Sequence, residues 1–354
     1  MVKLLLINPG STSTKIAVYE NDKMVFNKTI RHDIEEIVTF KTSYLQREYR
    51  EKHILEFLNE ANYQLVDFDY FIGRGGLLKP LVSGTYLVDE KMYEDLKNLT
   101  YGDHPCNLGG IIALDFANKV GKQAYIVDPV VVDELNPYAR VSGYQGIERR
   151  SAFHALNQKA IGKRFAEEHH KNYQDLTLII VHLGGGISIG LHQKGKVIDV
   201  NDAAGGDGAF SPDRAGALPI FPLIDETMKH KDDIVAFKKF LITKAGLYSY
   251  LKSNSVMEIE SRIKKGDQKA IFYVNAMAYN INKHIGALYF AAKGNVDALI
   301  ITGGIANNKY FTKVLKSFLP DNIPYYIYPG EDELSALASG ALKVIKGEEK
   351  LKRY

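Results

Sequence analysis

Near its start the chain carries Leu4-Leu5-Leu6-Ile7-Asn8-Pro9-Gly10, an apolar run that ends in a polar residue and a glycine turn. The pattern returns as Leu178-Ile179-Ile180-Val181-His182-Leu183-Gly184, shifted by 174 residues in a chain of 354. Each run is followed by small residues, a second β-rich stretch, a polar turn and a third short apolar stretch. Short apolar runs bounded by turn residues are typical of buried strands. The repeat predicts two similarly folded halves, although two buried strands with glycine turns can also resemble each other by chance.

Outside the repeat, the sequence predicts strands and helices in alternation, which is the pattern of an α/β fold. The predicted helices are 111–120, 151–169, 270–292 and 335–345, and further strands are predicted at 124–127 and 298–302. Four residues lie at the carboxyl ends of predicted strands: Asn8, Asp128, His182 and Gly303. Because open α/β sheets bind ligands beyond those ends, we expect the four to meet in one cleft.

The composition excludes several classes of protein. Hydrophobic residues make up 45% and charged residues 25%, which excludes a disordered chain, and the length corresponds to about two domains. The net charge of +3 is too small to indicate nucleic-acid binding, and no apolar run approaches the ~18 residues of a membrane span. The single cysteine, Cys106, excludes a disulfide framework and a multi-cysteine metal site. We therefore expect a cytoplasmic protein with no nucleic-acid or membrane partner.

Three loops carry the features of phosphate-binding turns. The first runs from Asn8 to Lys15 and holds four hydroxyls beside a glycine, so its backbone N–H groups and hydroxyls could cradle a phosphate. Its order differs from a Walker A loop, and an ordinary turn explains it equally well. The second holds Gly184, Gly185 and Gly186, and the third runs from Thr302 to Asn307. Glycine allows a ligand to approach the backbone closely, so three such loops favour a nucleotide.

Basic residues near these loops are candidates for binding an anion. His154 is predicted at a helix N-terminus, which favours anions, although a local hydrogen bond would also explain it. Arg214 lies in the Pro/Gly-rich stretch 211–216, Arg74 lies among three glycines, and His104 precedes a proline. Taken alone, each of these three could also be a solvated surface residue.

These motifs, together with Gly73-Arg74-Gly75-Gly76-Leu77-Leu78-Lys79-Pro80 and the stretch 328–338, resemble the acetate kinase/butyrate kinase family of the sugar kinase–Hsp70–actin superfamily. The first loop is similar to the family signature N-x-G-S-[ST]-S-x-K. The resemblance covers residues 3 to about 345 and implies two actin-like (ribonuclease H-like) α/β domains with a nucleotide cleft between them. We expect residues 1–150 to form the N-terminal domain, with 335–354 returning to it, and residues 151–334 to form the nucleotide-binding C-terminal domain.

The resemblance also implies roles for individual residues. Nucleotide-binding roles fall on Asn8, Ser11, Ser13, Lys15, Gly184, Gly185, Gly186, Gly303, Gly304 and Asn307. Catalytic roles fall on Arg214, Asp128, His154, His182, Arg74 and His104, and metal-associated roles on Asp128 and Glu333, with Glu331 as the alternative second carboxylate. The assignment of Arg74 stays open, because acetate kinases place their arginine three residues earlier, where this chain has Phe71.

The implied activity is phosphorylation of a short-chain carboxylate by ATP, with Mg²⁺ as cofactor and butanoate, isobutyrate or valerate as acceptor. A fatty acid is anionic at pH 7, so catalysis needs positive charge and positioning rather than a general base. We expect Arg214 and Arg74 to clamp the transferred group, His154 and His182 to act as neutral donors, and transfer to be direct and in line. A phosphoenzyme on a glutamate is the alternative to direct transfer.

Two residues are predicted to shape the acyl pocket. Phe153 is its expected wall, and Gly73 is expected to leave empty the volume that a valine fills in acetate-specific relatives. We also expect a homodimer or a higher homo-oligomer. The alternatives are an acetate, propionate or branched-chain acid kinase of the same fold and, in a different class, a non-catalytic actin- or Hsp70-like ATP switch.

Overall fold

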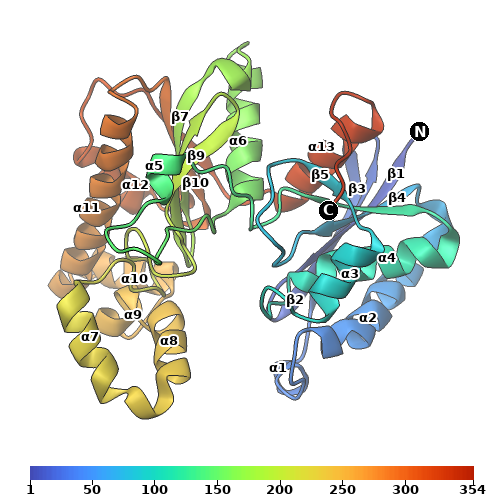
Figure 1. The fold of residues 1–354 in the computed structure, drawn as a ribbon, viewed down its shortest axis with the longest axis horizontal. Coiled ribbons are helices and arrows are strands. Elements are labelled where there is room, and N and C mark those ends of the chain that lie inside the picture. The colour runs from blue at the N-terminus through green and yellow to red at the C-terminus, as the bar shows by residue number, and fades with distance from the viewer. The chain divides into compact units, whose positions relative to one another are not determined.

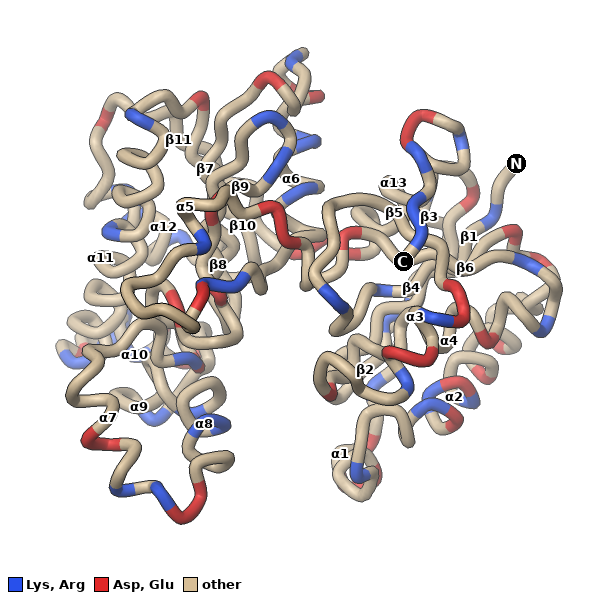
Figure 2. The backbone as a smooth tube through the Cα atoms, viewed as in Figure 1, with Lys and Arg blue, Asp and Glu red and all other residues tan.

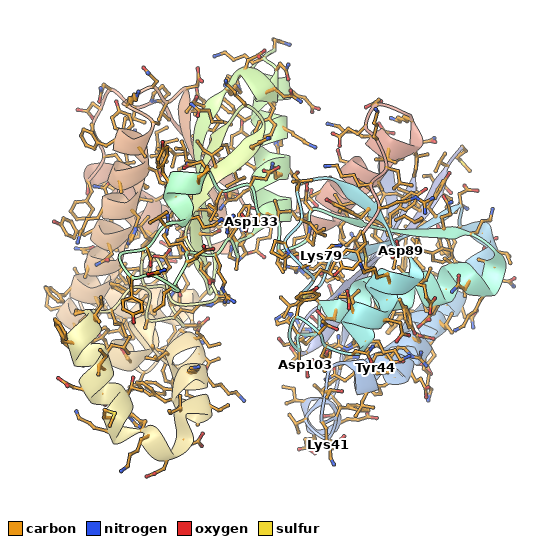
Figure 3. All side chains as sticks on the ribbon, viewed as in Figure 1. Lys41, Tyr44, Lys79, Asp89, Asp103 and Asp133 are labelled. Atoms are coloured by element: carbon orange, nitrogen blue, oxygen red, sulfur yellow. The ribbon has the colours of Figure 1, made fainter.

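The computed structural model describes residues 1–354, which divide into two compact units (Figure 1). The first unit comprises Met1–Val132 and Asp332–Tyr354, and the second comprises Asp133–Glu331. The division between the units therefore falls between Val132 and Asp133, and not at residue 150 as expected from the sequence. Segment 133–150 has its partners in the second unit: the Asn136 N–H donates to the Ile198 carbonyl, and Arg149 pairs with Asp199 at 2.9 Å. Asp133, which is labelled in Figure 3, forms an ion pair with Arg140 of the same segment at 2.6 Å.

The first unit is built on a six-stranded sheet with the order β3-β2-β1-β4-β6-β5. Its strands are β1 (Lys3–Pro9), β2 (Ser13–Glu20), β3 (Lys23–Arg31), β4 (Tyr70–Arg74), β5 (Thr85–Leu87) and β6 (Gln123–Val127). Its helices are α1 (Ile34–Ile37), α2 (Arg47–Glu60), α3 (Glu90–Lys97), α4 (Asn107–Val120) and α13 (Glu333–Ile345). Strands β1, β2 and β3 are antiparallel to one another, β4 and β6 run parallel to β1, and β5 is antiparallel to β6.

The second unit has a five-stranded sheet with the order β11-β10-β7-β8-β9. Its strands are β7 (Thr177–Leu183), β8 (Ile187–Gln193), β9 (Lys196–Val200), β10 (Ala298–Gly303) and β11 (Tyr325–Pro329). Its helices are α5 (Pro137–Arg140), α6 (Ala155–Glu168), α7 (Ile220–Lys229), α8 (Ile234–Thr243), α9 (Gly246–Leu251), α10 (Val256–Lys264), α11 (Gln268–Ala291) and α12 (Lys309–Ser317). No helix of either unit combines the length and the apolar character that a membrane span needs.

The two sheets confirm the predicted repeat. The order β3-β2-β1-β4-β6 in the first unit corresponds to β9-β8-β7-β10-β11 in the second. In both, the first three strands are antiparallel and the last two run parallel to the central strand. The repeated strands β1 and β7 lie at the centre of their sheets, where all their apolar residues are buried. This central position explains why the repeat is the clearest signal in the sequence.

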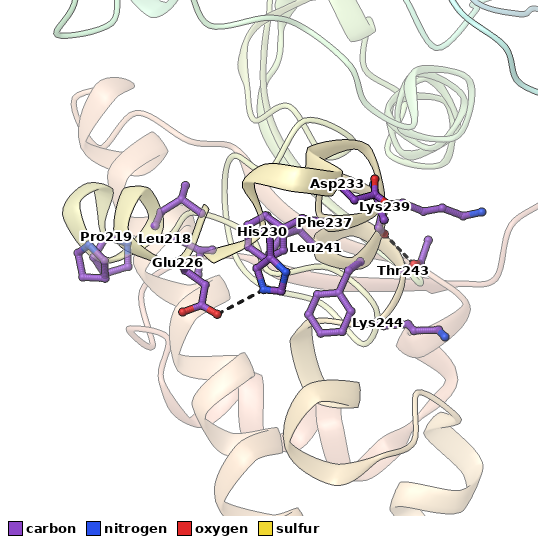
Figure 4. Close-up of a pocket in the computed structure, with 14 residues that line it drawn as sticks. Leu218, Pro219, Glu226, His230, Asp233, Phe237, Lys239, Leu241, Thr243 and Lys244 are labelled. Atoms are coloured by element: carbon purple, nitrogen blue, oxygen red, sulfur yellow. Dashed lines mark hydrogen bonds and ion pairs between the residues drawn. The ribbon is translucent and has the colours of Figure 1, made fainter. Parts of the chain in front are cut away.

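Charge is distributed evenly along both units. Figure 2 shows Lys and Arg alternating with Asp and Glu along the backbone of each unit, with no long segment of one sign. The helices α7 and α8 also expose large apolar side chains, among them Phe221 and Val235, which are 80% and 79% exposed. A cavity of about 820 Å³ lies between these helices, where His230 stacks on Phe237 and lies 3.5 Å from Glu226 (Figure 4).

Candidate active site

The predicted site residues are divided between the two units. The first unit holds Asn8, Ser11, Ser13, Lys15, Gly73, Arg74, His104, Asp128 and Glu333. The second holds Phe153, His154, His182, Gly184, Gly185, Gly186, Arg214, Gly303, Gly304, Asn307 and Glu331. Each group forms contacts of its own, so the two parts of the site are described in turn.

Two stacked histidines lie at the centre of the second unit's part. The rings of His154 and His182 are 3.7 Å apart between centroids and nearly parallel. His182 is buried at the end of β7, and its Nδ1 donates to Asn157 Oδ1 over 2.8 Å. Its Nε2 lies 3.0 Å from Glu331 Oε1 but has no hydrogen-bond partner in the chain. Because Nδ1 donates to Asn157, the Nε2 of a neutral ring would be an acceptor, and the predicted role of His182 as a donor stays a prediction.

His154 is held in the opposite tautomer. Ser188 Oγ accepts hydrogen bonds from Gln158 Nε2 and the His154 N–H, so its own proton is directed to His154 Nδ1, 2.8 Å away. The ring proton of a neutral His154 therefore lies on Nε2, which keeps the donor role available. The helix α6 begins at Ala155, one residue after His154, rather than at Ser151 as the sequence predicts.

Arg214 packs directly on the second glycine loop. A Cβ added to Gly186 would lie 2.6 Å from Arg214 Nη1, so a larger residue at this position would displace the guanidinium from where it lies. Ser211 Oγ donates to the Gly185 carbonyl, and the N–H of Gly184 donates to the Gly186 carbonyl at 3.1 Å. Besides the predicted approach of a ligand, the side chain of Arg214 therefore gives a second reason for a glycine in this loop.

Arg214 is a cation that forms no ion pair in this region. Its Nη1 donates to the Ala203 carbonyl, and no carboxylate lies within ion-pair distance. Burial lowers the pKa of Arg214, and nearby Asp213 and Asp202 oppose that shift, so the group stays cationic at pH 7. It lines a cavity of about 810 Å³ with Arg149 and Arg150, both of which are paired with aspartates.

In the third loop, Gly303 packs closely against Leu183, whereas the space beside Gly304 is open. Gly303 has a φ of 91°, and a Cβ there would lie 2.4 Å from the Leu183 carbonyl oxygen. At Gly304 an added Cβ would meet no atom within 4 Å, so the open space that a ligand requires is at this glycine. Asn307 donates from Nδ2 to the Gly304 carbonyl at 3.1 Å and fixes the turn.

Three predicted residues of the first unit form one cluster. Glu333 Oε2 accepts from Asn8 Nδ2 at 2.7 Å, and both carboxylate oxygens of Glu333 lie within 3.0 Å of Arg74 Nη1. Arg74 Nη1 also donates to Asn8 Oδ1 at 3.3 Å. The charge of Arg74 is thus compensated by Glu333, which makes Arg74 a weaker candidate for the clamp than Arg214.

Asp128 follows the last residue of β6 and has a φ of 38°, in the left-handed region that few non-glycine residues adopt. Its Oδ1 accepts from Ser83 Oγ at 2.6 Å and from the Gly84 N–H at 2.7 Å, while Oδ2 has no hydrogen-bond partner. The structure contains no group of three or more His, Cys, Asp or Glu side chains arranged to hold a metal. Mg²⁺ commonly uses one or two carboxylates with waters and substrate phosphates, so the free oxygen of Asp128 fits such a ligand.

Gly73 does not leave space for an acyl chain, which corrects the pocket predicted for it. A Cβ at Gly73 would lie 2.2 Å from the carbonyl oxygen of Gly109, because β4 packs directly against the backbone of α4. Phe153 is buried, and its role as a pocket wall stays a prediction. His104 is exposed, and its Nδ1 lies 3.0 Å from the sulfur of the buried Cys106.

We expect Gly73→Ala to destabilise the protein, because neither backbone can move away from the added methyl without disrupting the β4–α4 contact. Overpacking of this kind costs about 1–3 kcal/mol. Gly286→Ala is the matched control, since its Cβ would meet no atom within 4 Å. Thermal unfolding of both variants checks this expectation, and equal melting temperatures for Gly73→Ala and the parent would contradict the packing argument.

The residues that orient the histidines are not indicated by the predicted motifs. Asn157, Gln158 and Ser188 are buried, and each donates to or accepts from the histidines or their partners. A signal was present, because Asn157 and Gln158 follow His154 by three and four residues and therefore share its face of α6.

Comparisons with known proteins identify the family. The model described as the Acetokinase family matches residues 137–319. Butyrate kinase 2 of Clostridium acetobutylicum is 47% identical over 352 residues, covering 99% of both chains, and Butyrate kinase 1 of that organism is 47% identical over 354 residues, covering 100% of both.

Solved structures share the fold at lower sequence identity. The acetate kinase of Porphyromonas gingivalis has a TM-score of 0.79 and 19% identity, covering 98% of this chain and 100% of its own. A propionate kinase from Francisella tularensis subsp. tularensis has a TM-score of 0.75 and 18% identity, covering 96% and 99%. The predicted α/β fold of two similar halves is thereby confirmed, and the chain belongs to the Acetokinase family.

Proposed function

We propose that this protein is an ATP-dependent carboxylate kinase that converts butanoate and ATP to butanoyl phosphate and ADP, reversibly. The observation that carries the proposal is the unpaired guanidinium of Arg214, seated on the second glycine loop beside a cavity. The choice of butanoate rests on the two butyrate kinases that match the whole chain, since Gly73 no longer supports it. Acetate and propionate remain the alternative acids, and isobutyrate and valerate are further candidates.

The chemistry needs charge compensation more than proton transfer. The acceptor carboxylate is anionic at neutral pH, so it can attack the γ-phosphoryl group without a general base, and repulsion by the polyanionic nucleotide is the obstacle. Arg214 offers a planar fork to the equatorial oxygens, and His154 offers a donor at Nε2. When bound, Mg²⁺ would neutralise charge on the β- and γ-phosphates, and Asp128 is the residue that would hold it. We propose direct in-line transfer.

Two further properties are proposed with the activity. The exposed apolar residues of α7 and α8 support assembly into a homodimer or a higher homo-oligomer, because single apolar residues are common on surfaces but clusters mark interfaces. The cytoplasmic location expected from the single cysteine stays a prediction.

The proposed reaction is tested by trapping its product. Hydroxylamine converts an acyl phosphate to a hydroxamate, so incubation with ATP, Mg²⁺ and butanoate should give a hydroxamate that depends on both ATP and the enzyme. Parallel rates with acetate, propionate, isobutyrate and valerate rank the acids. A non-catalytic ATP switch of the same fold would give no hydroxamate with any acid, and that result would contradict the proposal.

A further inference from the structure

Arg50 of α2 is a fully buried arginine that contacts the first phosphate-loop candidate. It is 0% exposed, and all five of its N–H groups are used: two donate to Gln46 Oε1 and three to the loop. The three loop acceptors are the carbonyls of Ser11 and Ser13, both at 3.1 Å, and Thr14 Oγ1 at 3.0 Å. The guanidinium is therefore completely satisfied by hydrogen bonds.

Its positive charge, however, has no counter-ion within ion-pair distance in the chain. Every acceptor of Arg50 is a neutral oxygen, and no carboxylate pairs with it. Burial lowers the pKa of Arg50 to about 10, so the group stays charged at neutral pH. Charged side chains are seldom fully buried without a partner, because removing a charge from water is costly. An anion bound at the adjacent loop would provide the missing compensation.

The loop itself is arranged to receive such an anion. Arg50 binds the carbonyls of Ser11 and Ser13, the His32 N–H binds that of Thr12 at 3.0 Å, and the Gly10 N–H binds that of Ser13 at 2.7 Å. Three consecutive acceptors are thus occupied from within the unit. The N–H groups of Ser11 and Thr12, which are exposed residues, have no hydrogen-bond partner, and neither do the hydroxyls of Ser11, Thr12 and Ser13. A turn with its acceptors occupied and its donors free is a receptor for phosphate oxygens.

Two basic side chains, Arg50 and His32, contact Thr14 Oγ1, and only Arg50 is charged at neutral pH. His32 lies on the far side of Thr14, with Nε2 2.8 Å from Thr14 Oγ1. Burial, followed by the charges of Arg50 and His53, lowers the pKa of His32 to about 4, so its ring is neutral at pH 7. Arg50 therefore supplies the charge, and His32 closes the hydrogen-bond network around Thr14.

We propose that Arg50 is a positioning residue that holds the turn Gly10–Thr14 in the conformation that binds a phosphate group of the nucleotide. The inference rests on the proposed function, since it takes ATP as the ligand. Arg50 acts through the loop and does not itself touch the substrate. It occupies two carbonyl oxygens that would otherwise repel an anion, and it adds a buried positive charge beside the loop that carries the free N–H donors.

The test uses Arg50→Lys, which keeps a charge but cannot make five planar hydrogen bonds, and Arg50→Met, which removes the charge. We expect the KM for ATP to rise about tenfold or more in both, with the KM for butanoate changed less than about twofold. Titration calorimetry with ADP should show the same weakening. Ile54→Ala is the matched control, because Ile54 is equally buried on the same helix one turn later. It should lower the melting temperature and leave the KM for ATP unchanged.

Gln46→Met provides a milder variant, which removes the acceptor of two Arg50 hydrogen bonds and touches no loop atom. It should raise the KM for ATP less than Arg50→Lys does. An Arg50→Lys enzyme with a KM for ATP within twofold of the parent would overturn the inference, as would an equal rise in Ile54→Ala. Failure of the parent to bind ADP would instead overturn the proposed function, and the two failures are therefore distinguishable.

Discussion

Replacement of Arg214 by alanine is expected to lower kcat by about 10²–10³-fold, with a much smaller change in the KM for ATP. The guanidinium is cationic, partly buried and free of any ion pair. Its positive charge can therefore stabilise the negative charge that develops during phosphoryl transfer. Removing one preorganised donor that acts on the developing charge costs most in the transition state and little in the ground state. Steady-state kinetics of the purified variant provide the measurement.

Arg214→Lys separates charge from geometry. A lysine keeps the positive charge but cannot offer two parallel N–H donors, so we expect it to recover little of the lost kcat. Circular dichroism controls for the fold, because Arg214 also packs on Gly186 and donates to the Ala203 carbonyl. A folded Arg214→Ala enzyme within threefold of the parent kcat would remove Arg214 from the mechanism.

Asp128→Asn is expected to lower kcat by about 10²-fold at ordinary Mg²⁺ concentrations. The substitution is close to isosteric: the amide oxygen can still accept from Ser83 Oγ and from the Gly84 N–H. Asparagine also tolerates the left-handed backbone at this position better than most residues. What it removes is the negative charge, and it replaces the free Oδ2 by an N–H₂ group that cannot bind a cation.

Rates measured across a Mg²⁺ titration check this expectation, since a lost metal ligand shifts the activating concentration upward. Unchanged thermal unfolding would establish that the effect is not structural. Parent-like rates at every Mg²⁺ concentration would show that Asp128 does not assist metal binding.

Much of the fold was predictable because its strongest signals are local. Strands β1 and β7 are buried on both faces, so their apolar runs are continuous, and their shared pattern gives the two equivalent sheets. Gly121 ends α4 in a left-handed conformation, as a glycine after a helix predicts. By contrast, the start of α6 differs from the prediction, because Ser151 is a good capping residue that is not used as a cap.

The parts that could not be predicted depend on contacts between distant residues. Glu333 and Arg74 are 259 positions apart, so nothing in either motif indicates that they neutralise each other. The space beside Gly73 is filled by the backbone of Gly109. The lack of a side chain at residue 73 does not indicate this, because Gly109 is distant in the sequence. Arg50 looks like an ordinary helix residue in the sequence, and only its burial against the carbonyls of the first loop distinguishes it.

The measurement that tests the central claim most directly is ATP formation from butanoyl phosphate and ADP. This direction needs no trapping reagent, and a hexokinase-coupled assay reports ATP continuously. The account predicts ATP in an amount equal to the butanoyl phosphate consumed, at a rate that depends on Mg²⁺ and is nearly lost in Arg214→Ala. Consumption of butanoyl phosphate to free phosphate without ATP, or no consumption by a folded enzyme that binds ADP, would contradict the assignment of this protein as a butanoate kinase.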